Sequence, residues 1–62
     1  MPAITVDIAG LSLDQKRQLV EKLSRCASEV TGIRPEAFYI FINEYGRENI
    51  AVGPTLLADK KG

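Results

Sequence analysis

The second residue of the chain, Pro2, has the clearest potential for chemistry. Removal of the initiator Met1 is expected because the residue after it is small, and removal would leave a proline with a free secondary α-amine. An α-amine titrates near pH ~8, and partial burial disfavours its charged form and lowers its pKa further. A neutral amine on a rigid element is suited to general base catalysis. Proline is also an ordinary first residue of a strand, where no ladder donor is needed.

Few other side chains are reactive. Cys26 lies on an apolar stripe, where a free cysteine behaves as a small hydrophobe, and the sequence has no histidine to activate it. With one cysteine and no histidine, a zinc site is not expected, and no metal or cofactor is indicated. Asp7 and Glu44 each come at the end of a predicted strand, so a carboxylate pair for acid–base chemistry is an open alternative.

The element that must position Pro2 is a predicted strand over residues 2–8. Apolar and polar residues alternate along it, which is typical of a strand with one buried face. The apolar positions are Ile4, Val6 and Ile8, and the polar ones are Thr5 and Asp7.

A long helix is predicted between Ser12 and Gly32. Ser12 and Gln15 form a capping-box pattern, and Gly32 suits the position after a helix end. An apolar stripe at helical spacing comprises Leu19, Val20, Leu23, Cys26, Ala27 and Val30. A ladder of alternating charge at i, i+4 spacing comprises Arg17, Glu21, Arg25 and Glu29.

A second strand is predicted over Phe38–Ile42, which is rich in aromatic and β-branched residues. Because nearly every position is apolar, we expect the helix to cover one face and another subunit to cover the other. A polar turn at 45–49, a short extended piece at 50–52 and one helical turn at 56–60 follow. A helix between two strands predicts a right-handed βαβ unit with parallel strands. The fold class is therefore α/β, with a short C-terminal hairpin, in one domain over residues 1–62.

Composition limits both the partners and the compartment. A chain of 62 residues with 45% hydrophobic residues has a marginal core of its own, which favours oligomerisation. Eight basic and eight acidic residues give zero net charge without a basic stripe, so no nucleic-acid partner is expected. No apolar run is long enough to span a membrane and no signal peptide is evident, so the cytoplasm is the expected compartment.

The whole chain, from Pro2 to about Lys60, resembles the 4-oxalocrotonate tautomerase family. The resemblance rests on the proline after Met1, on Gly10-x-Ser12-x-Asp14-Gln15-Lys16 opening the helix, on Ile42-Asn43-Glu44 ending the second strand, and on the element order. It implies a homohexamer built as a trimer of dimers. It also implies that the processed proline moves a proton between carbon and oxygen of a small enol or 2-oxo acid.

The resemblance also implies roles for other positions. The two substrate-binding arginines of the family fall on Leu11 and Tyr39, and the shielding aromatic residue falls on Ile50. Tyr39 can still donate one hydrogen bond to an enolate oxygen. Leu11 and Ile50 make the pocket more apolar, which favours a less charged substrate such as a monoacid. Arg47, in the turn before the hairpin, is a substitute cation or an ordinary solvated residue.

Several alternatives are open at this point. Arg34, in the connector after the helix, could reach a neighbouring subunit. The chain could use Pro2 for hydration or decarboxylation. It could be one subunit of a mixed hexamer in which a partner chain supplies the arginines. It could also be a non-enzymatic scaffold or binding protein that has kept the fold.

Overall fold

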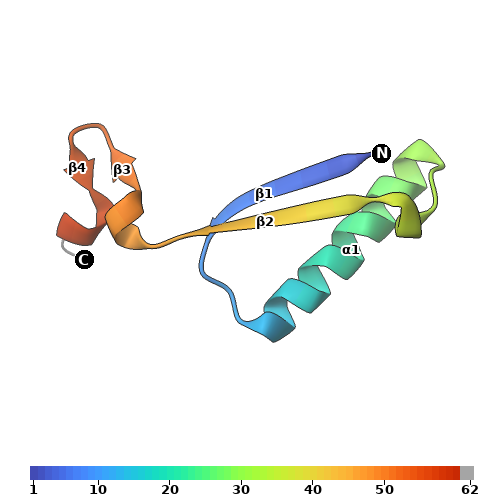
Figure 1. The fold of residues 1–62 in the computed structure, drawn as a ribbon, viewed down its shortest axis with the longest axis horizontal. Coiled ribbons are helices and arrows are strands. Elements are labelled where there is room, and N and C mark those ends of the chain that lie inside the picture. Colours follow the sequence, from blue (N-terminus) through green and yellow to red (C-terminus); the bar gives the residue numbers. More distant parts are fainter. Residues whose placement is uncertain (61–62) are drawn as a thin grey trace.

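The computed structural model describes residues 1–60, so the last two residues of the predicted 1–62 domain lie outside the described range. Strand β1 (Ala3–Ala9) leads into helix α1 (Leu13–Thr31), and a 3₁₀ turn at Pro35–Ala37 leads into strand β2 (Tyr39–Tyr45). These elements form the body of the molecule (Figure 1). Residues 46–60 form an arm, which contains strands β3 (Ala51–Val52) and β4 (Thr55–Leu56) between 3₁₀ turns at Arg47–Asn49 and Leu57–Asp59.

Strands β1 and β2 are parallel, as the length of the connection between them predicts. Their register pairs Ala3 with Tyr39 at one end and Ala9 with Tyr45 at the other. The range Phe38–Ile42 predicted from composition was too short, because β2 continues to Tyr45, one residue beyond the Glu44 end that the resemblance implied. Its polar last residues stay in the strand because each has a partner in β1. Pairing across the ladder therefore outweighs their composition.

The alternation of side chains separates the two faces of this sheet. Even-numbered residues such as Ile4 and Ile40 lie half-buried on one face, and α1 lies along that side of the strands (Figure 1). Odd-numbered residues, including Tyr39 and Phe41, lie on the open face, where these two are 55% and 48% exposed. The helix therefore covers one face of the apolar second strand, as predicted, and the other face of the strand is exposed in the single chain.

Helix α1 begins and ends as predicted. The Ser12 hydroxyl accepts the Gln15 N–H, the Gln15 side chain accepts the Ser12 N–H, and Gly32 ends the helix at φ 77°. Most of the predicted apolar stripe is half-buried, but Cys26 and Val30 are exposed. Of the predicted charge ladder, the Glu21–Arg25 pair forms at 3.2 Å, and the other pairs are absent within residues 1–60.

The arm extends beyond the end of the sheet and has few contacts with the body (Figure 1). Gly53 makes the tight turn between β3 and β4 with a positive φ of 61°, a conformation that glycine adopts without strain. The Leu57 N–H donates to the Ile50 carbonyl at 2.8 Å, which ties the two ends of the arm's hairpin together. The short C-terminal hairpin of the predicted fold is thus confirmed.

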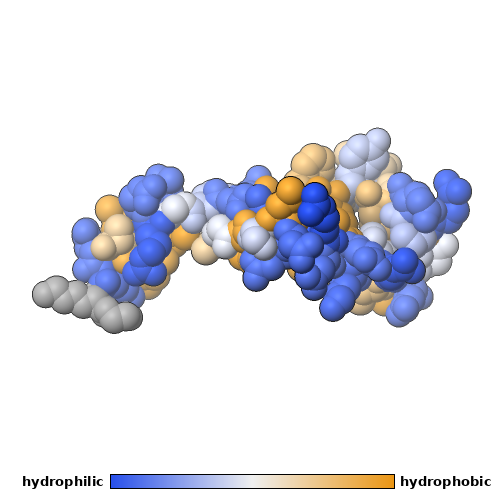
Figure 2. Space-filling view, turned by 90° about the horizontal axis from the view of Figure 1, so that it is seen from below, coloured by the Kyte–Doolittle hydropathy of each residue, from blue (hydrophilic) through white to orange (hydrophobic). Residues whose placement is uncertain are grey.

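No residue within 1–60 is fully buried. The radius of gyration is 15.1 Å, whereas a compact domain of this length has about 11 Å. The accessible surface is 4871 Å², against about 4,000 Å² for a compact monomer of this mass. Apolar residues lie at the surface of both body and arm (Figure 2). The chain by itself thus lacks the closed core that a small domain needs for stability.

Among the residues that the structure describes, none of the helices combines the length and the apolar character needed to cross a bilayer.

Candidate active site

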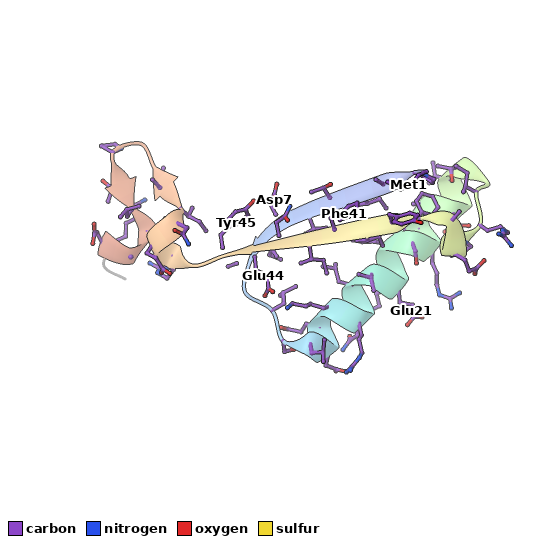
Figure 3. All side chains as sticks on the ribbon, viewed as in Figure 1. Met1, Asp7, Glu21, Phe41, Glu44 and Tyr45 are labelled. Atoms are coloured by element: carbon purple, nitrogen blue, oxygen red, sulfur yellow. The ribbon has the colours of Figure 1, made fainter. Side chains whose placement is uncertain are left out.

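Pro2 lies directly before β1 and is half-buried. Its carbonyl accepts the main-chain N–H of Tyr39 at 3.0 Å, so the residue is held by the sheet. Met1, which precedes it, is 80% exposed and lies beside the start of β2 (Figure 3). While Met1 is attached, the Pro2 nitrogen is an amide without basicity, so a catalytic role requires that Met1 be removed.

Tyr39 is the first residue of β2 and stands opposite Ala3 in the register. The structure therefore brings Pro2 and Tyr39 together at one end of the sheet. A phenol can donate to a developing oxyanion. A base and a donor in adjacent positions of paired strands are the two groups that a proton shift between carbon and oxygen requires.

Leu11 lies at the other end of β1, in the short loop that leads into α1. It lines a shallow groove of about 300 Å³ with Ile8, Gln15, Gln18, Leu19 and Lys22. Three of these six side chains are aliphatic, two carry an amide and one carries an ammonium group. Lys22, which sequence reasoning missed, makes no ion pair within residues 1–60.

Ile50 and Arg47 belong to the arm. The Arg47 guanidinium donates to the Leu57 carbonyl at 2.5 Å, so one of its N–H groups stabilises the arm itself. Ile50 lines an open concavity of about 560 Å³ between the arm and the end of the sheet. The other lining residues are Asp7, Ile8, Ala9, Tyr45, Asn49 and Ala51.

The predicted site residues thus fall into two groups at opposite ends of the sheet. Strand β1 has seven residues, which separates Pro2 from the Leu11 loop by about 23 Å at about 3.3 Å per residue. A substrate small enough to be held at Pro2 does not reach Leu11 or Ile50 of the same chain. Arg34 lies before the 3₁₀ turn at Pro35–Ala37, near the Pro2 end.

A polar cluster on the open face was not anticipated. Oδ1 of Asp7 accepts the Asn43 side-chain amide at 3.1 Å and the Tyr45 hydroxyl at 3.0 Å. The hydrogen bond to the Asp7 carboxylate raises the pKa of Tyr45, and the negative charge of Asp7 adds to the effect. The strand register was the signal that could have revealed this cluster, because Asp7 pairs directly with Asn43.

Asp7 and Glu44 do not form a carboxylate pair within the chain. Asp7 lies on the open face with Tyr45, while Glu44 points to the side of α1 (Figure 3). Glu44 accepts the Leu11 N–H at 2.9 Å and pairs with the Lys16 ammonium at 2.5 Å. The Lys16 hydrogen bond, reinforced by the Leu11 N–H, holds the pKa of Glu44 below its usual value. Residues 1–60 contain no group of three His, Cys, Asp or Glu side chains placed to hold a metal ion.

Comparisons with known proteins cover nearly the whole chain. The family model described as "Tautomerase enzyme" matches residues 2–60. A probable tautomerase of Bacillus cereus is 39% identical over 61 residues, which are 97% of this chain and 100% of the relative. A 2-hydroxymuconate tautomerase of Bacillus subtilis is 38% identical over 60 residues, covering 95% of this chain and 97% of the relative. The crystal structure of a homologue of 4-oxalocrotonate tautomerase has a TM-score of 0.88 at 36% identity, covering 97% of this chain and 100% of that one.

These similarities confirm the expected family, the α/β fold and the isomerase activity, and they do not favour the non-enzymatic scaffold. Family members act on small molecules. The chain therefore belongs to the tautomerase family and is an isomerase of the 4-oxalocrotonate tautomerase type.

Proposed function

We propose that this tautomerase uses processed Pro2 as its general base and acts on a small enol or 2-oxo acid with one carboxylate. The observation that carries the proposal is the hydrogen bond from the Tyr39 N–H to the Pro2 carbonyl. It holds a potential base and a phenol donor at the same end of the sheet, while Leu11 and Ile50 supply apolar walls elsewhere.

The proton shift needs only these groups. The neutral Pro2 nitrogen takes the proton of the enol hydroxyl, and the electron pair of that O–H bond becomes the carbonyl π bond. The π electrons of the C=C bond then form the new C–H bond with a proton from the Pro2 ammonium, which restores the amine. The Tyr39 hydroxyl donates a hydrogen bond to the oxygen while it carries negative charge.

The substrate class follows from the residues that stand at the positions of the family's arginines. Arginine binds a carboxylate through two charge-assisted hydrogen bonds, which neither Leu11 nor Tyr39 reproduces. A second carboxylate on the substrate would therefore lack its partner. The name of the Bacillus subtilis relative points to 2-hydroxymuconate, a diacid, and we expect this chain to prefer a monoacid with an apolar tail.

The complete pocket requires further copies of the chain. The separation of Pro2 from Leu11 and Ile50 along β1, the exposed Tyr39 and Phe41, and the absence of any fully buried residue within 1–60 all support assembly. We propose a homohexamer built as a trimer of dimers, in which copies bring the two ends of the sheet together. Sedimentation equilibrium tests this assembly, and a monomer at micromolar concentration would contradict it.

The decisive experiment compares ketonisation of phenylenolpyruvate by Met1-processed protein with that of its Pro2→Ala variant. Mass spectrometry first establishes that Met1 is absent from both. We expect turnover by the native chain and loss of most of it, roughly 10²-fold or more, in the variant, since a positioned base contributes about that factor. Equal turnover by both proteins would exclude Pro2 as the base. Turnover of 2-hydroxymuconate but not of the monoacid would contradict the proposed substrate class.

A further inference from the structure

We propose that Glu44 is a positioning residue for substrate binding: its carboxylate fixes the main chain of Leu11, and with it one wall of the pocket. The inference rests on the proposed function, because it takes Leu11 as part of the substrate site.

Glu44 occupies a position where the strand pattern expects an apolar residue. Along β2, Ile40 and Ile42 are half-buried on the same face of the strand. Glu44 is the next residue on that face, and its side chain points to the side of α1 (Figure 3). A carboxylate that faces a helix loses part of its hydration and needs hydrogen-bond partners. The structure supplies two such partners, and both lie at the start of the helix.

The two oxygens of the Glu44 carboxylate have separate partners. Oε2 accepts the main-chain N–H of Leu11 at 2.9 Å, and Oε1 pairs with the ammonium of Lys16 at 2.5 Å. Hydrogen bonds to an ionised group are shorter and stronger than neutral ones. The end of β2 is therefore joined both to the loop before α1 and to the first turns of α1, although these segments are far apart in sequence.

The Leu11 loop is consequently fixed from two sides. On the helix side, the capping box between Ser12 and Gln15 holds the residue that follows Leu11. On the strand side, the Leu11 N–H donates to Glu44 Oε2, its only hydrogen-bond acceptor among the described residues. Without this bond, the loop keeps its helix cap but loses the hydrogen bond that fixes the position of Leu11 relative to the sheet.

This arrangement predicts an effect on binding rather than on the proton transfer. Pro2 lies about 23 Å from the Leu11 loop in the same chain, and its hydrogen bond with Tyr39 does not involve Glu44. A role in positioning the pocket wall therefore raises KM and leaves kcat nearly unchanged. A role only in stability would lower the melting temperature without changing KM.

Four variants separate these roles. Glu44→Ala removes both interactions. Lys16→Met removes the ion pair and leaves the carboxylate for Leu11. The double variant combines Glu44→Gln with Lys16→Met. The glutamine oxygen can still accept the Leu11 N–H, and the loss of the Lys16 ammonium prevents the glutamine NH2 group from facing another donor. Glu21→Gln is the matched control, because it breaks the exposed Glu21–Arg25 pair on the same helix, away from the loop.

We expect KM for phenylenolpyruvate to rise roughly three- to tenfold in Glu44→Ala, with kcat within about twofold of the native value, as the net contribution of one typical hydrogen bond implies. Lys16→Met, the double variant and Glu21→Gln should keep a KM within about twofold of the native value. An unchanged KM in Glu44→Ala would overturn the proposal. A double variant as impaired as Glu44→Ala would also overturn it, because the ion pair and not the tie to Leu11 would then be responsible.

A second measurement does not depend on turnover. Hydrogen exchange of the Leu11 amide, followed by nuclear magnetic resonance, should accelerate in Glu44→Ala and stay slow in the double variant. Equal exchange rates in both variants would show that the Leu11 N–H does not donate to position 44. Pro2→Ala, measured in parallel, keeps the two proposals distinguishable. Turnover that requires Pro2 together with an unchanged KM in Glu44→Ala would refute only the role of Glu44. Absence of both turnover and phenylpyruvate binding in the native chain would refute the proposed function, and this inference with it.

Discussion

The main-chain N–H of Tyr39, the first residue of β2 in the parallel ladder, donates to the carbonyl of Pro2 at 3.0 Å. The relative position of the proposed base and the phenol is therefore set by backbone hydrogen bonding. Side-chain substitutions at either position leave this bond in place. The contributions of the two side chains can consequently be tested one at a time.

Tyr39→Phe should lower kcat by roughly 10²-fold, because it removes one donor to the enolate oxygen while the ring and the main-chain bond to Pro2 remain. The measurement is steady-state turnover of phenylenolpyruvate. The melting temperature and the sedimentation of the variant should match those of the native chain. A Tyr39→Phe enzyme with native kcat would show that the phenol does not stabilise the oxyanion.

Leu11→Arg should shift the preference toward diacids. An arginine at this position adds two donors for a carboxylate, so the ratio of kcat/KM for 2-hydroxymuconate to that for phenylenolpyruvate should rise about tenfold or more. The matched control is Leu13→Arg, which adds the same charge two residues further on, where the side chain is already 62% exposed. Equal shifts in both variants would indicate a general electrostatic effect and not a contact at position 11.

The stabilising effect of Glu44 should disappear in acid. Lys16 and the Leu11 N–H hold the pKa of Glu44 below its usual 4.5, so the folded chain binds this proton less readily than the unfolded chain does. The contribution is therefore fully present above about pH 4.5 and is lost as the pH falls through the lowered pKa. The measurement is the melting temperature against pH for the native chain and Glu44→Gln. The two curves should differ at pH 7 and converge in acid, and a constant gap would contradict the assignment.

Tyr45 should ionise only at unusually high pH. The Asp7 carboxylate accepts its hydroxyl proton and raises the pKa of Tyr45 above the usual 10.0, so any stability gained from the pair is lost as the pH rises through the raised pKa. Asp7→Asn should bring the titration of Tyr45 back toward 10.0. Ultraviolet absorbance of the phenolate, recorded in a Tyr39→Phe background, isolates the titration of Tyr45 within residues 1–60. An unshifted titration would show that the two side chains do not interact in solution.

Local signals in the sequence predicted the fold well. The capping box at Ser12 and Gln15 and the glycine at position 32 determined the helix, and both caps depend on residues close together in the chain. Composition placed the end of β2 too early, because Asn43 and Glu44 are poor strand residues. They stay in the strand through pairing with β1, which is far away in sequence.

The site was predictable only in part. The sequence indicated Pro2 and Tyr39, and the parallel register explains why they meet. The hydrogen bond between Glu44 and Leu11 was missed because it joins residues 33 positions apart. One signal was available, because Glu44 follows Ile40 and Ile42 at every second position, on the strand face that packs against the helix. In the proposed assembly, the placement of Leu11, Ile50 and Arg47 around one substrate would depend on contacts between copies, which no pattern within one chain encodes.

Every residue of β1 pairs with a residue of β2. The number of residues between Pro2 and the Leu11 loop is therefore fixed by the sheet. Insertion of one residue in β1 would turn every preceding side chain to the opposite face and would rotate the terminal amine away from the Tyr39 side. Insertion of two residues would preserve the faces but move the amine by about 7 Å. The length of strand β1 therefore sets the distance between the terminal amine and the Leu11 loop. A change in that length affects the enzyme more severely than the replacement of most side chains of β1.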